Sequence, residues 1–513
     1  MHSSLSQTKH KGQALLWVLG FLATIAVTFA GVYSVGQTTS EKQKIVNAAD
    51  AAAYTGAMVE ARALNLTAYA NRAEIANEVY LAQMVSLQSW VDYMKTSAEN
   101  WKTVAEAVAA IFPPAGTVAS ALEAIETGLS ASATGIESSM PLIINTLENV
   151  YYKPLDFALN LVFGATGATN MAIASQSAAD AVLAANVATQ GGKLDSAPVA
   201  INAVALGAIN AMEWKKAFHR YDSAIGEDAG SATDDGRRNT KEILRASRDE
   251  FSTERKGPDG LFEVFFGNFT TPFPARCPAP EFGVSRDGLT TLKEYDRWEA
   301  QDTTEYYLAS GAKCKKTGIP MGWGRSTAAK QQSEGDLKDD PHRWGGSNAY
   351  DEVKKNANWT GVKPLWDVSR DSNDYPVAAF KPGEETLTFT VAVAKQKTNI
   401  RNNEHASLNF MNTANTTSRL GSVDAKADYM DGQISAKSEA KVFFSRPARN
   451  AADFTGTRLF REDNHKEISN LYNPYWQVRL KNVETNPFGM SAKDLAKITA
   501  IYGANLPLAP FSQ

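Results

Sequence analysis

Side chains that could bind a metal ion occur in one short acidic string. The residues DVSRDSND at 367–374 place oxygen ligands at alternate positions, as a calcium-binding loop does. The string lacks the central glycine of such a loop, and Ala378 stands where the bidentate carboxylate should fall. The pair Asp234 and Asp235 makes no better site. We therefore expect a solvated turn at 367–374, no metal site and no cofactor.

Residues for acid–base or covalent catalysis are equally scattered. Outside the first ten residues, no two histidines lie at the spacing that places ligands on one helix face. The chain also has no Gly-x-Ser-x-Gly elbow and no GxxxxGK[ST] phosphate loop. The histidines are His2, His10, His219, His342, His405 and His465. These observations predict a protein that is not an enzyme.

The composition is that of a globular protein. The 513 residues include 52 Lys and Arg, 56 Asp and Glu, and 43% hydrophobic residues, with a net charge of −4. This composition excludes disorder of the whole chain. Because the two charge signs are mixed, we expect no extended basic surface and no nucleic-acid partner. All 20 prolines lie at or after Pro113, so the first fifth of the chain can form an uninterrupted helix.

An uncharged apolar segment, ALLWVLGFLATIAVTFAGVYSV, occupies residues 14–35 and is long enough to cross a membrane as a helix. Basic residues at 9–11 precede it, so the positive-inside rule places residues 1–13 in the cytoplasm and the rest of the chain outside. The lipid bilayer is therefore an expected partner. Small residues along the span would allow other membrane helices to pack closely, with lipid-facing filler as the alternative. They are Gly20, Ala23, Ala26, Ala30 and Gly31.

Two other interpretations of this N-terminus compete with an uncleaved anchor. A cleaved secretory signal has the same order of basic and apolar residues, but its apolar run is shorter. A prepilin-type leader would be cut after Gly12, yet Trp17 stands where that leader normally has glutamate. The helix-rich sequence that follows the span also favours an uncleaved, single-pass anchor.

The segment after the span predicts a long helical stalk. Every third or fourth residue over 80–108 fits the seam of a helix packed along another helix. These residues are Tyr80, Met84, Leu87, Val91, Met94, Ala98, Trp101, Ala105 and Val108. We expect the seam to contact the helices that follow, with self-association as the alternative. The helix should end at Pro113, and a break near Asn65 or Asn71 is compatible with the sequence.

Further helices are expected at 118–150, 155–189 and 197–221, in a segment rich in small residues. Their asparagines are expected to bond from helix to helix: Asn160, Asn170, Asn186, Asn202 and Asn210. The polar residues GEDAGSATDDGRR then predict a linker at 226–238. The chain is thus divided into a tail at 1–13, a transmembrane helix at 14–35, a helical stalk and hairpins at 36–225, this linker, and a head at 239–513.

The head is expected to be a loop-rich α+β domain. Four runs have the composition of strands: 261–269, 387–394, 440–445 and 475–480. Its tryptophans are expected to be buried, with stacking on sugars or bases as the alternative. They include Trp323, Trp344, Trp359 and Trp366. The fold class is therefore α+β, with an N-terminal transmembrane helix, a helical bundle and a mixed head.

The two cysteines, Cys277 and Cys314, both lie in the head, with 36 residues between them. An even pair in an exported domain indicates one disulfide. Closing that loop would stabilise the fold by about 3 to 4 kcal/mol in the chain-entropy model. Two buried thiols are the alternative. Zinc is not favoured, because two isolated cysteines without a paired histidine do not supply four ligands.

The run NAADAAAYTGA at 47–57, following an apolar helix preceded by Gly12, resembles the N-terminal region of TadG-like proteins of the tight-adherence (Tad, or Flp) pilus. The resemblance implies an inner-membrane, periplasm-facing component of pilus assembly. Proteins of this kind often carry a von Willebrand A domain with an Asp-x-Ser-x-Ser metal site. The corresponding string here has Asp371 in place of the second serine, so that site is not expected.

From this resemblance we expect a non-enzymatic structural or assembly protein that binds other pilus proteins or pilins through its N-terminal helix. The expected partner interface is Asn47, Ala48, Ala49, Asp50, Ala52, Ala53, Gly56 and Ala57. Asp50 could pair with a lysine or a helix N-terminus of a neighbour. The alternative function is a minor-pilin adhesin, whose head would bind a surface or a glycan.

Overall fold

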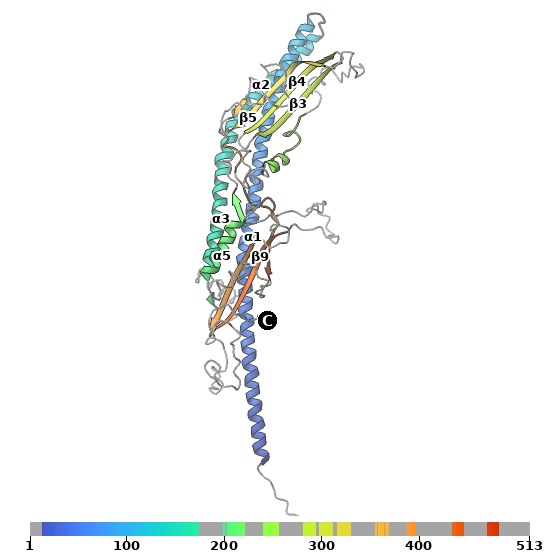
Figure 1. Ribbon diagram of the computed structural model, residues 1–513. Coiled ribbons are helices and arrows are strands. Elements are labelled where there is room, and N and C mark those ends of the chain that lie inside the picture. Colours follow the sequence, from blue (N-terminus) through green and yellow to red (C-terminus); the bar gives the residue numbers. More distant parts are fainter. Residues whose placement is uncertain are drawn as a thin grey trace, which may run out of the picture.

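The computed structural model describes residues 13–173, 199–200, 203–220, 240–255, 281–293, 297–310, 315–329, 354–356, 358–363, 365–368, 387–396, 433–445 and 469–481. It is an elongated α+β molecule built on one central helix (Figure 1). This confirms the predicted fold class: an N-terminal apolar helix, long helices and then mixed β-sheets.

Helix α1 runs unbroken from Gln13 to Ala109, a length of 97 residues. At 1.5 Å per residue this amounts to roughly 145 Å. No proline interrupts it, and the chain turns just before Pro113 and Pro114, where the N–H groups of Ile111 and Phe112 bond to Val108 O. The predicted continuous helix is confirmed, and the helix is not broken near Asn65 or Asn71.

Helix α2 (Ala115–Thr146) folds back along the upper part of α1. Leu122 packs with Trp101 and Ala105 near the turn, and Met140 packs with Leu81 at the far end of α2. This antiparallel contact confirms the expected packing of the α1 seam on a following helix. At the two ends of the seam, Tyr80 and Val108 are exposed.

The chain continues through a six-residue π-helix, η1 (Leu147–Tyr152), into α3 (Lys153–Ile173). The predicted helix at 118–150 thus corresponds to α2 and part of η1, and the next predicted helix corresponds to α3, with 174–189 outside the described residues. The third, at 197–221, was predicted too long. There α5 (Ala203–Ala217) is flanked by two short strands, β1 (Val199–Ala200) and β2 (Phe218–Arg220).

The lower of the two larger sheets in Figure 1, called the lower sheet, has the order β1-β8-β9-β10 and is antiparallel. Its longer strands are β8 (Leu387–Gln396), β9 (Gln433–Phe444) and β10 (Trp476–Lys481). They confirm the strands predicted at 387–394, 440–445 and 475–480. The strand predicted at 261–269 lies outside the described residues.

The upper of the two larger sheets in Figure 1, called the upper sheet, has the order β3-β4-β5-β6, with β6 parallel to β5. Its strands are β3 (Glu281–Lys293), β4 (Arg297–Ser310), β5 (Lys315–Ala329) and β6 (Lys354–Asn356). The sequence did not predict them. A third, two-stranded sheet pairs β2 with β7 (Trp366–Val368).

Both larger sheets pack on α1, and α1 supplies much of each core. The lower core joins the alanines at 48–61 of α1 to β8, β9, Trp214 of α5 and Trp476 of β10. The upper core joins residues 75–85 of α1 to α2, Trp298 of β4 and Trp359. Because β1 and β2 precede the predicted linker and pair with β8 and β7, segments on either side of 226–238 share the same sheets.

Candidate functional site: the N-terminal helix

The N-terminal part of α1 is an exposed apolar helix. Residues Ala14–Tyr33 are long and apolar enough to cross a membrane, and none of this span is buried inside the protein. A β-carbon added at Gly20 or Gly31 would meet no atom within 4 Å. Ala23 and Ala26 are exposed, while Ala30 and Gly31 are half-exposed. The small residues predicted for membrane packing therefore lie on an exposed part of the helix.

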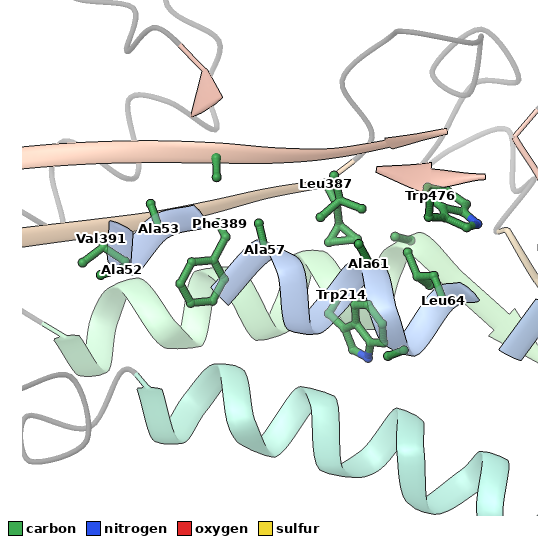
Figure 2. Close-up of a cluster of buried hydrophobic side chains, with 14 of the residues drawn as sticks. Ala52, Ala53, Ala57, Ala61, Leu64, Trp214, Leu387, Phe389, Val391 and Trp476 are labelled. Carbon is green, nitrogen blue, oxygen red and sulfur yellow. The ribbon is translucent and has the colours of Figure 1, made fainter. Parts of the chain in front are cut away.

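The next stretch of the helix is covered by the protein itself. Most of the residues predicted to form a partner interface are buried: Ala48, Ala49, Ala52, Ala53, Gly56 and Ala57. Strand β8 covers this face with Leu387, Phe389 and Val391 (Figure 2). Of the other two predicted residues, Asn47 is exposed and Asp50 is half-buried.

Small side chains on α1 are what allow the sheet to come this close. The Phe389 ring lies over Gly56, where a β-carbon would overlap it (Figure 2). Alanines before and after Gly56 present only methyl groups, so the strand can lie almost on the helix backbone. Near the membrane end, Lys42 Nζ donates to Ser435 O at the start of β9. In this structure the small-residue face of α1 is therefore the surface on which the chain's own lower sheet packs.

The opposite face of α1 is free and was missed by the sequence analysis. Tyr54, Leu66 and Tyr69 are exposed, Tyr69 by 60% of its surface. The same segment exposes the basic residues Lys44 and Arg62. By contrast, the four glutamates between 41 and 78 are all buried: Glu41, Glu60, Glu74 and Glu78. Tyrosine and arginine are enriched at protein interfaces, so Tyr54, Tyr69 and Arg62 favour this face as a binding surface. A signal for it existed in the sequence, because these residues repeat on one helix face.

Residues 12–59 match the Tad family of proteins, described as Flp pilus-assembly TadE/G-like. This segment is a TadE/G-like domain. It contains the whole apolar span and the small-residue face that β8 covers. No curated protein matches the chain. No solved structure matches it either.

Beyond the TadE/G-like segment, the upper sheet contacts α1 through a close backbone approach and a hydrogen bond from Ser89 to a buried, ion-paired carboxylate. Gly324 of β5 lies against the backbone of α1 at Ser89 and Tyr93, with no room for a β-carbon. Arg255 binds Asp302 of β4 through two nitrogens, at 2.7 and 2.9 Å, and Ser89 Oγ donates to the same carboxylate at 2.8 Å. The buried polar groups here hold the sheet on the helix.

Asparagine side chains of α1 and α5 form hydrogen bonds with strand backbones. Asn65 of α1 accepts from Trp476 N and donates to Trp476 O, both at 3.0 Å. Asn210 of α5 donates to Thr390 O and accepts from Thr390 N. The expected helix-to-helix bonds are therefore wrong for Asn210. Asn160 donates to Asp156 O of its own helix, and a bond from it to another helix stays a prediction. The side chains of Asn170, Asn186 and Asn202 lie outside the described residues.

The structure also locates the residues first considered for metal chemistry. Asp367 is fully buried in β7, and its Oδ1 accepts from Val368 N and Leu471 N, so the predicted solvated turn is wrong at this residue. Residues 369–374 lie outside the described part of the chain. Among the described residues, no group of three or more His, Cys, Asp or Glu side chains could hold a metal ion.

The predicted tryptophan core is confirmed at Trp359, which is fully buried. Trp366 stacks on Phe163 of α3, with ring centroids 4.0 Å apart, and is half-buried, as is Trp323. Trp344 lies outside the described residues. So do Cys277 and Cys314, and their disulfide remains a prediction.

Proposed function

We propose that this protein is a non-enzymatic structural component of a Tad (Flp) type pilus assembly apparatus. Residues 14–35 anchor it in the inner membrane, with the N-terminus in the cytoplasm and the bulk of the chain in the periplasm. The observation that carries the proposal is the position of the TadE/G-like segment on α1. One rigid helix joins the apolar span to both β-sheets, so a force or a movement at the membrane would reach the whole outer part.

The buried polar groups support a structural role. Ser89 and Asn65 of α1 bind strands to the helix through Asp302 of β4 and Trp476 of β10, and Arg255 pairs with the same Asp302 carboxylate. Such groups stabilise a unique arrangement of helix and sheet. We therefore propose that the part of the protein outside the membrane presents a fixed surface along α1.

Partners in the apparatus would then meet α1 on the faces that the chain leaves uncovered. These faces are the membrane span with Gly20 and Gly31, and the exposed stripe of Tyr54, Leu66 and Tyr69. In a membrane, small residues allow helix backbones to approach and pack. Because Ala49 and Ala52 are buried under β8, leucine there would disturb the protein's own core and would not report on a partner.

A substitution in the span tests this partner role without touching the fold. Gly20→Leu and Gly31→Leu should reduce co-purification of other pilus-assembly proteins and reduce surface pili. Gly128→Leu is the matched control, because Gly128 is an exposed helical glycine of α2 with no atom within 4 Å of an added β-carbon. Unchanged co-purification and piliation in both span variants would contradict partner packing through the span.

Mechanical shearing of cells tests the anchored location. The protein should remain in the inner-membrane fraction, and an exported reporter fused after residue 513 should be active, while one fused at the N-terminus should not. Recovery of the protein with the sheared filaments would contradict a stationary assembly component. It would favour a minor pilin instead.

A further inference from the structure

Several described segments connect the upper and lower cores, among them residues 358–363 and residues 471–472. Residues 358–363 lie between β6 of the upper sheet and β7, whose Trp366 packs on the lower core. Within this segment Trp359 is fully buried. The backbone is left-handed at Asn358, with φ of 83°, and at Gly361, with φ of 92°. Surrounding packing must hold such a conformation at a non-glycine residue.

The carboxyl group of Glu78 on α1 is central to the contact between this segment and the helix. The side chain is buried in the upper core, and Trp298 Nε1 of β4 donates to Glu78 Oε2 at 3.3 Å. Tyr152 on η1 and Trp359 belong to the same core, and both act on the pKa of this carboxyl. The guanidinium of Arg248 lies over the Trp298 ring, 5.6 Å from its centroid. Three separate elements therefore meet α1 at one ionisable group.

Two other buried carboxylates lie near Glu78. Glu74 lies one turn earlier on α1, and Glu148 lies on η1. The cation that acts on Glu78 is Lys363, whose Nζ is 2.8 Å from Glu148 Oε1 and 4.9 Å from the centroid of the Tyr152 ring. Glu148 also accepts from Thr360 N at 2.8 Å. Lys363 is thus already engaged with Glu148 when Glu78 loses its proton.

Burial accordingly raises the pKa of Glu78 to about 7, while Lys363, Trp298, Tyr152 and Trp359 oppose that rise. Burial, and then the charge of Glu78, raise the pKa of Tyr152 far above its usual value, so the phenol stays neutral. Around neutral pH, the proton that changes is therefore the one on Glu78. When it leaves, a negative charge develops in the apolar core, where Lys363 is already paired with Glu148.

We propose that Glu78, Tyr152 and Lys363 form a proton-controlled joint between η1, residues 358–363 and α1. When Glu78 is neutral, the three elements pack closely and the upper and lower sheets are held in one arrangement along the helix. When Glu78 is ionised, the carboxylate draws in water or competes with Glu148 for Lys363. The contacts of η1 and of residues 358–363 with α1 then loosen, while the rest of each sheet stays on the helix.

Hydrogen exchange measured by mass spectrometry on the full chain in detergent, from pH 5.5 to 8.5, tests the joint. After correction for the intrinsic pH dependence of exchange, peptides covering 147–156 and 358–366 should exchange roughly tenfold to a hundredfold faster at the alkaline end. Peptides from β4 and β9 should show no such excess. Glu78→Gln, which cannot ionise, should abolish the excess.

Glu99→Gln is the matched control, because Glu99 lies on the same helix and is half-exposed beside Lys95. Glu99→Gln should show the same dependence of hydrogen exchange on pH as the wild type. Lys363→Gln removes the cation that favours the ionised form of Glu78, so the rise in exchange should move to higher pH. An excess that persists in Glu78→Gln would overturn the joint. If that variant does not fold, an unshifted profile in Lys363→Gln would overturn it instead.

Discussion

The ring of Phe389 on β8 lies directly over Gly56 of α1, at a point where the helix has no side chain (Figure 2). A β-carbon at residue 56 would overlap three ring atoms. Gly56→Ala should therefore destabilise the protein by about 1 to 3 kcal/mol, as overpacking of a tight core does. Its free energy of unfolding would be measured by denaturant titration in detergent.

The control for this prediction is Gly128→Ala on the exposed face of α2, where nothing lies within 4 Å of an added β-carbon. Alanine is favoured over glycine inside a helix, so this variant should be neutral or more stable by roughly 0.5 to 1 kcal/mol. Combining Gly56→Ala with Phe389→Leu should cost less than the sum of the two single changes, since the smaller side chain removes the clash. Additive costs would show that the ring and the glycine do not interact.

The buried pair of Arg255 and Asp302 should be sensitive to the loss of one charge. Asp302→Asn leaves the guanidinium without its carboxylate inside the upper core and should cost about 3 to 5 kcal/mol. The exposed pair of Arg245 and Glu242, at 3.5 Å, is the matched comparison. Glu242→Gln should cost less than about 1 kcal/mol. Similar losses in the two variants, by chemical unfolding, would contradict the assigned burial of the first pair.

The contact between Asn65 and Trp476 should stabilise the edge of the lower sheet. Asn65→Leu removes both hydrogen bonds to the backbone of β10 and should cost about 1 to 3 kcal/mol, because the strand's N–H and C=O lose their partner. Asn160→Ala is the control, since that exposed amide donates to Asp156 O of its own helix α3. Exchange of the Trp476 amide hydrogen should accelerate in Asn65→Leu alone. An unchanged amide would contradict the assigned bond.

The sequence was most informative where local patterns decide structure. The absence of proline before Pro113 and the uncharged residues at 14–35 were enough to predict α1, because helix propensity and apolar length act along one segment. The strands at 387–394 and 475–480 were found because β-branched and aromatic residues mark them. The upper sheet was missed because β3, β4 and β5 contain many polar residues, among them Asp302 and Thr304, which are buried only by tertiary contacts.

The small-residue face shows a different limit of sequence analysis. Alanines at 48–57 correctly indicated a close-packing surface, but helix periodicity does not say whether a helix or a strand will pack there. Phe389 lies more than 330 residues further along the chain, and no local pattern links it to Gly56. Glu78 was hidden for the same reason. Its burial depends on Trp298 and Trp359, which come from distant segments.

Glu78 also predicts an unusual dependence of global stability on pH. Its pKa is about 7 in the folded protein and 4.5 at its ordinary value, so the folded state holds the proton more tightly. The contribution of protonated Glu78 to the free energy of unfolding is fully present below pH 4.5. It is lost as pH rises through 7 and remains lost at higher pH. The loss amounts to roughly 3 kcal/mol. Relative to the wild type, Glu78→Gln should therefore become steadily more stable from pH 5 to pH 8, whereas Glu99→Gln should run parallel to the wild type. Urea unfolding midpoints across this range measure the difference. A constant gap between Glu78→Gln and the wild type would mean that Glu78 has the same pKa in the folded and unfolded states.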